Sequence, residues 1–152
     1  MNIRRILVCT LIFIVILVAA FLRESKTRLT SELIDASYRG NIRKIELLID
    51  QGAPVDGRGY DGWTPLSVAA REGHLAAVKA LITKGADVDV QEGGGNAPLF
   101  WAAFYGHLDV VKFLMESGAD KYMRCSDCMS VIDAARKQGH EQIVLILEKS
   151  NN

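Results

Sequence analysis

The sequence predicts an all-α solenoid of short antiparallel helix pairs with projecting β-hairpin-like fingers, preceded by an N-terminal hydrophobic helix. The first observation is a period of 33 residues, which sets the architecture before any single helix is assigned. The second is an apolar run from Ile6 to Leu22 in which Thr10 is the only clearly polar residue. Three positions show the period best: Gly40, Gly73, Gly106 and Gly139; Leu33, Leu66, Leu99 and Ile132; Ala36, Ala69, Ala102 and Ala135.

The N-terminal segment, residues 1–22, has a short cationic start followed by the apolar run. As a helix, Ile6 to Leu22 spans roughly 26 Å, slightly less than the ~30 Å hydrocarbon core, so it is a candidate membrane anchor. The small residues up to Ala20 also fit cleavage by signal peptidase, so a cleaved signal peptide is the alternative. A third interpretation, in which this segment is a buried helix of a soluble protein, is disfavoured because a solenoid has no enclosed centre in which to bury it.

The localisation follows from the same segment. The tail before the apolar run is short, and such a tail usually stays in the cytoplasm. We therefore expect a single-pass protein of a bacterial inner membrane with its repeats on the periplasmic side. The alternative is a soluble periplasmic or secreted protein after cleavage.

The rest of the chain divides into a linker, residues 23–29, and a repeat domain, residues 30–152. The repeats are placed at about 27–58, 59–91, 92–124 and 125–152, following the 33-residue step.

The second repeat shows how each element is specified. Thr64 can cap a helix whose first residue, Pro65, has no N–H to leave unpaired. Gly73 ends this first helix where a left-handed residue is needed, and Gly85 ends the second. Between these glycines an apolar stripe of Val78, Leu81 and Ile82 predicts one buried helix face. The segments between helix pairs are rich in Asp, Gly and β-formers, as projecting fingers require.

These motifs resemble the ankyrin repeat. The second repeat carries the signature as Asp61-Gly62-Trp63-Thr64-Pro65-Leu66, followed by Ala69-Ala70-Arg71-Glu72-Gly73-His74. The third carries Ala97-Pro98-Leu99, Gly106-His107 and Gly118-Ala119-Asp120. The histidine that the family has after Thr-Pro-Leu is replaced by Ser67 and Phe100. The resemblance is to short exported or membrane-anchored bacterial ankyrin-repeat proteins, and it implies binding of a partner protein through the concave side and the fingers.

Three histidines, His74, His107 and His140, occupy equivalent positions, which stacked repeats place about 10 Å apart. One metal ion cannot bridge them, so we expect them to bond backbone groups and predict no metal site. The pattern G-x-G-x-x-G in residues 57–62 lies in a finger rather than between a strand and a helix. We therefore expect turn glycines there and no cofactor.

The pair Cys125 and Cys128 lies in the finger between repeats three and four. It has no second cysteine pair to complete a zinc site, which leaves a local disulfide, free thiols or a redox dithiol. Thiol-disulfide redox activity through this pair is the alternative function.

The main prediction is a non-enzymatic protein-protein interaction module. An open repeat array offers no convergent nucleophile, base and orienting group, and the equal numbers of basic and acidic residues, 18 each, imply no face for nucleic acid. Register places aromatic and arginine side chains on the concave and finger surface, a composition typical of binding hot spots. The alternative is that these aromatic residues only fill space in the groove of the solenoid and bind no partner. The predicted partner-binding residues are Tyr38, Arg39, Arg58, Tyr60, Trp63, Arg71, Phe104 and Tyr105.

Overall fold

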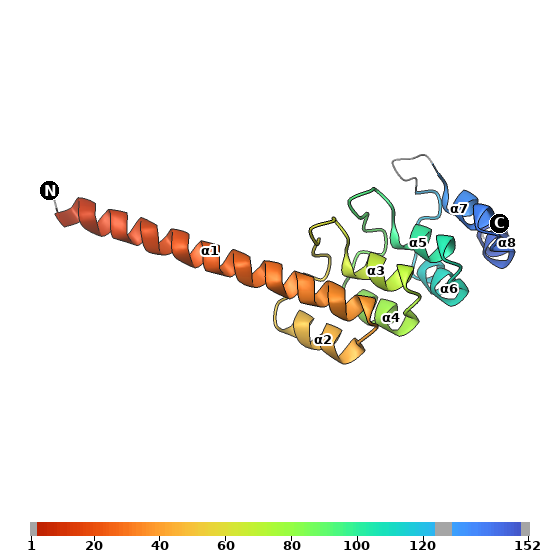
Figure 1. The fold of residues 1–152 in the computed structure, drawn as a ribbon, viewed down its shortest axis with the longest axis horizontal. Coiled ribbons are helices and arrows are strands. Elements are labelled where there is room, and N and C mark those ends of the chain that lie inside the picture. Colours follow the sequence, from red (N-terminus) through yellow and green to blue (C-terminus); the bar gives the residue numbers. More distant parts are fainter. Residues whose placement is uncertain (1–2, 124–128, 150–152) are drawn as a thin grey trace.

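The computed structural model describes residues 3–123 and 129–149, and of residues 3–10 only the backbone. Within these residues the chain forms eight helices and no strand, arranged as two rows of a solenoid (Figure 1). The first row consists of α1 (Ile3–Tyr38), α3 (Pro65–Arg71), α5 (Pro98–Phe104) and α7 (Val131–Lys137). The second row consists of α2 (Ile42–Asp50), α4 (Leu75–Thr83), α6 (Leu108–Glu116) and α8 (Glu141–Lys149). The predicted all-α solenoid is confirmed.

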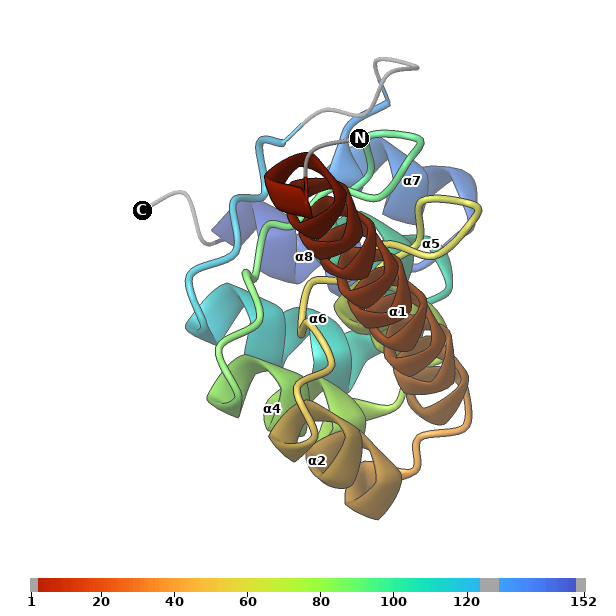
Figure 2. The same ribbon diagram turned by 90° about the vertical axis from the view of Figure 1, so that its left-hand side faces the viewer.

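Each helix packs on its partner within a repeat and on the same helix of the next repeat. Contacts run along the first row through α1, α3, α5 and α7, and along the second through α2, α4, α6 and α8. Figure 2 shows the second row following the curve of the array. Each repeat therefore completes its core only against its neighbours, as in other solenoids.

The helices begin where the sequence provides caps. Thr64 accepts a hydrogen bond from the backbone N–H of Ser67, and Ser130 accepts one from the N–H of Asp133. In the third repeat Ala97 stands at the same position with extended backbone and provides no side-chain bond. The hydroxyl of Thr64 also lies 2.9 Å from that of Ser67, so the residue in the place of the family histidine takes part in the cap.

The core consists of the ladders predicted from the 33-residue period. The alanine ladder is fully buried in all four repeats, which lets adjacent first-row helices approach closely. Leu81 and Leu114, in the two central repeats, are also fully buried. In the last repeat the equivalent residues Ile132 and Val144 are only partly buried.

The histidine ladder links successive repeats through the backbone. The Nε2 atoms of His74, His107 and His140 lie 2.9, 2.8 and 3.1 Å from the carbonyl oxygens of Tyr38, Arg71 and Phe104. Each of these oxygens belongs to the end of a first-row helix, where carbonyl groups have no partner inside the helix. The expected backbone bonding of the histidines is confirmed.

Gly73 has two reasons to be glycine. Its φ of +75° is unfavourable for other residues, and a Cβ there would lie 2.5 Å from Nδ1 of His107. Gly139 has a similar φ of +77° but faces open space. A comparison of substitutions at these two glycines therefore distinguishes the effect of backbone strain from the effect of the histidine contact.

Replacing Gly73 by Ala is expected to destabilise the domain more than replacing Gly139 by Ala. Both changes impose about 1–2 kcal/mol of left-handed strain. Only Gly73→Ala also pushes His107 away from the Arg71 carbonyl, which adds about 1–3 kcal/mol. Urea unfolding of the two variants measures the difference, and equal losses would mean that the ring moves aside without losing its bond.

Three fingers project on the same side of the array (Figure 1): finger 1 (residues 51–64), finger 2 (84–97) and the described parts of finger 3 (117–130). Equivalent bonds close the first two, from Gly59 N–H to the Trp63 carbonyl and from Glu92 N–H to the Asn96 carbonyl. The two tips are also joined by a 3.1 Å bond from Gly93 N–H to the Gly62 carbonyl. The fingers thus resemble hairpins, but their described residues are held by turns rather than by strand pairing.

Helix α1 extends far beyond the repeats at its N-terminal end (Figure 1). Its described apolar stretch, Leu11 to Leu22, is about 18 Å long and is followed by Arg23 and Glu24. Among the residues that the structure describes, no helix combines the length and the apolar character needed to cross a membrane. This finding contradicts the predicted localisation as a single-pass membrane protein anchored through Ile6 to Leu22.

Candidate functional site

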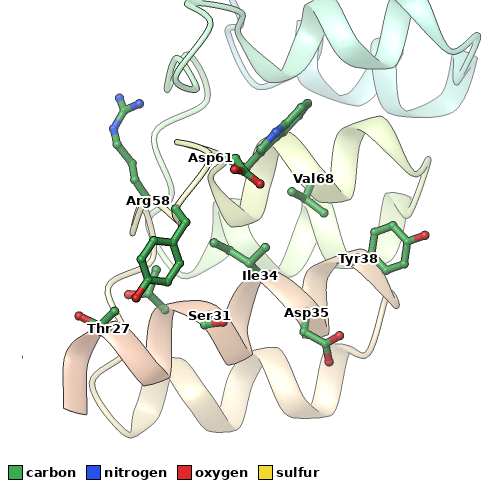
Figure 3. A pocket seen from close by; sticks show the side chains of 12 residues that line it. Thr27, Ser31, Ile34, Asp35, Tyr38, Arg58, Asp61 and Val68 are labelled. Atoms are coloured by element: carbon green, nitrogen blue, oxygen red, sulfur yellow. The ribbon is translucent and has the colours of Figure 1, made fainter. Parts of the chain in front are cut away.

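A groove of about 520 Å³ lies between α1, finger 1 and α3 (Figure 3), and we call it the N-terminal groove. Ile34 and the buried side chain of Val68 provide apolar lining, and Figure 3 shows Tyr38 at one end and Thr27 and Arg58 toward the other. Tyr60 is almost completely exposed. The complete lining is Thr27, Thr30, Ser31, Ile34, Asp35, Tyr38, Arg58, Gly59, Tyr60, Asp61, Trp63 and Val68.

Glycines let finger 1 approach α1 and so shape this groove. A Cβ at Gly57 would lie 2.8 Å from Cγ2 of Thr30, and one at Gly59 would lie 2.9 Å from Cδ1 of Ile34. Close packing and turn geometry therefore explain the G-x-G-x-x-G pattern. In the same finger, burial raises the pKa of the Asp56 carboxyl above its ordinary value. The carboxylate also accepts a hydrogen bond from the backbone N–H of Asp87, and this bond lowers the pKa in part.

A second group of side chains, the aromatic cluster, adjoins the groove through Trp63. It consists of Trp63, Phe100, Trp101, Phe104 and Tyr105. The ring centroids of Trp63 and Trp101 are 4.9 Å apart, and those of Phe104 and Tyr105 are 5.2 Å apart. These spacings lie in the favourable range for aromatic pairs, so the cluster forms a packed surface across repeats two and three.

Arg71, at the end of α3, lies in this cluster. Its guanidinium carbon is 5.3 Å from the ring centroid of Trp63 and 5.6 Å from that of Tyr105. Its Nε is 3.6 Å from a carboxylate oxygen of Glu72. Two cation-π contacts therefore hold the charged group against the aromatic surface.

The structure divides the predicted binding residues into two adjoining groups. Tyr38, Arg58 and Tyr60 line the groove, and Arg71, Phe104 and Tyr105 belong to the cluster or contact it. Trp63 belongs to both groups. Arg39 does not line the groove; it pairs at 3.0 Å with Asp35, whose side chain does.

Trp101 is the residue that sequence reasoning missed. It precedes Phe104 and Tyr105 by three and four positions, the spacing at which side chains share a helix face. This spacing could have predicted Trp101 as a neighbour of Phe104 and Tyr105 on the same helix face. In the described part of the chain, the indole Nε1 of Trp101 and Oδ1 of Asn96 are buried without a hydrogen-bond partner.

Finger 2 is organised by a buried carboxylate. Glu92 accepts bonds from the backbone N–H groups of Gly94 and Asn96 and from the Asn96 side chain at 2.8 Å. The finger beside the aromatic cluster therefore has a defined shape although it contains three consecutive glycines.

In residues 11–123 and 129–149, whose side chains the structure describes, no group of three or more His, Cys, Asp or Glu is placed to hold a metal ion. Cys125 and Cys128 lie outside the described residues, so their predicted disulfide or redox role stays a prediction.

The structure is that of a helical-repeat protein. Its helix pairs are stacked, its histidine side chains bond the backbone of the preceding repeat, and its fingers project from one open face. Residues 33–125 match the family model of ankyrin repeats in three copies, and the chain belongs to the ankyrin-repeat family. Repeats of this family are in general non-enzymatic modules for protein-protein interaction. The comparison with curated proteins gives no match.

Proposed function

We propose that the chain binds a partner protein through one continuous surface, formed by the N-terminal groove and the aromatic cluster. The observation that carries this proposal is the row of aromatic side chains that begins at Tyr38 and Tyr60, continues through Trp63 and ends at Tyr105. Tyr60, Tyr38 and Tyr105 are 98%, 54% and 44% exposed. Adjoining large side chains that are open to water form an exposed patch, which marks interaction sites in a way that single exposed residues do not.

The composition of this surface supports the same proposal. Tyrosine, tryptophan and arginine are the residues most enriched among binding hot spots, because each offers a large contact area and a polar group. Trp63 and Phe104 are partly buried by their neighbours and so are already ordered before a partner arrives. Binding then requires little further loss of side-chain entropy.

An affinity-capture experiment tests the location of the surface. The full chain and two double variants serve as baits, and captured proteins are quantified by mass spectrometry. Replacing Tyr38 and Tyr60 by Ala is expected to reduce recovery of the specific partner at least about tenfold, since hot-spot truncations commonly cost over 1 kcal/mol each.

The matched control replaces Leu47 and Leu145 by Ala. These leucines lie on second-row helices and are 56% and 54% exposed, comparable to Tyr38. They should leave the recovery unchanged. Loss of the partner in the leucine variant, with full recovery in the tyrosine variant, would place the binding face on the second row and contradict the proposal.

A further inference from the structure

Arg71 is the one positive group of the proposed surface that aromatic rings hold from two sides, Trp63 from finger 1 and Tyr105 from the end of the third repeat's first helix. An arginine side chain normally loses much rotamer freedom when it binds a partner. Here the rings already restrict the guanidinium group. It is therefore prepared to donate hydrogen bonds without further ordering.

The donors of Arg71 are not used up inside the protein. Its one ion pair in the described part of the chain joins Nε to Glu72 at 3.6 Å, a distance longer than a good charge-assisted hydrogen bond. No hydrogen bond from its two terminal nitrogens to another described residue is present. The guanidinium group lies against parts of the two rings, so the part of it that remains available to a partner is its edge.

The charge and the planar shape of that edge indicate which chemical group of a partner would bind there. A planar guanidinium matches a carboxylate with two parallel N–H···O bonds, and the apolar rings beside it reduce competition from water. We infer that Arg71 anchors an acidic side chain of the partner protein, with an apolar residue beside that acid packing on Trp63 and Tyr105. This inference rests on the proposed function and specifies the chemistry of the partner.

Peptide display provides the probe. A random peptide library is panned against the full chain, with counter-selection on the chain in which Trp63 and Tyr105 are both Ala, so that peptides bound elsewhere are removed. Each selected peptide is then made in two forms, with its acidic residue or with the matching amide. The chain has only two tryptophans, and both lie in the aromatic cluster, so tryptophan fluorescence reports binding at this place.

We expect the selected peptides to share an Asp or Glu beside an apolar residue. The amide form should bind about tenfold more weakly to the wild-type chain, the usual effect of losing a charged hydrogen bond. Arg71→Gln should weaken the acidic form about as much and remove the difference between the two forms. Arg71→Lys keeps the charge but not the planar fork, so it should restore only part of the affinity.

Selected peptides without a shared acid, or acid and amide forms of equal affinity, would overturn the inference and leave the proposed binding surface intact. A library that yields no peptide dependent on Trp63 and Tyr105 would contradict the proposed function and the inference together. If Arg71→Gln does not fold by circular dichroism, the acid and amide pair on the wild-type chain decides alone.

Discussion

Replacing Leu81 and Leu114 together by Ala is expected to unfold the repeat array at room temperature. Both side chains are fully buried on second-row helices of the two central repeats, α4 and α6, which pack on each other. Each Leu→Ala change in a packed core costs about 2–5 kcal/mol, against a total stability of about 5–15 kcal/mol for a typical domain. Because the two repeats stabilise each other and their outer neighbours, the loss should spread along the array.

Circular dichroism at 222 nm and urea unfolding measure this effect. The matched control again carries Leu47→Ala and Leu145→Ala, which remove the same atoms from positions more than half exposed. It should change the free energy of unfolding by about 1 kcal/mol or less. Similar losses in the two double variants would show that burial in the leucine ladder does not hold the array together.

The period of 33 residues was enough to predict the fold, because each repeated residue has a local task. Thr64 and Pro65 start a helix, Gly73 ends it, and Leu81 faces the next repeat. Such features depend on a few neighbouring residues and on identical stacking, so the sequence determines them repeat by repeat. The burial of the alanine ladder follows from the same rule.

The details of the candidate site depend on contacts that the period does not encode. The N-terminal groove requires finger 1 to close on Thr30 and Ile34 of α1. The position of Arg71 between two rings depends on where side chains from adjacent repeats point. Trp101 was overlooked because its counterpart in the second repeat, Val68, is not aromatic.

The predicted localisation was wrong. The described part of the apolar run, Leu11 to Leu22, is about 18 Å long, which is shorter than the ~30 Å hydrocarbon core, and Arg23 and Glu24 follow it in the same helix, which runs on to Tyr38. Among the described residues, no helix has both the length and the apolar character to cross a membrane.

Replacing Trp63 and Tyr105 together by Ala is expected to weaken partner binding by several kcal/mol, or more than about a hundredfold. Large aromatic residues at the centre of an interface commonly cost about 2 kcal/mol or more each when truncated. The double change also removes both rings that hold the Arg71 guanidinium, so the arginine would have to be ordered by the partner. The affinity loss should therefore exceed the sum expected from contact area alone.

The fold should survive this change, because neither residue belongs to the buried ladders and Tyr105 is 44% exposed. Trp63 is partly buried on Trp101, so a loss of about 1–2 kcal/mol in stability is expected, well below that of the double leucine variant. Titration calorimetry with the captured partner measures the affinity, and urea unfolding checks the stability. Full affinity in a folded Trp63→Ala, Tyr105→Ala variant would mean that the aromatic cluster only fills the space between repeats, and the binding face would have to lie elsewhere on the array.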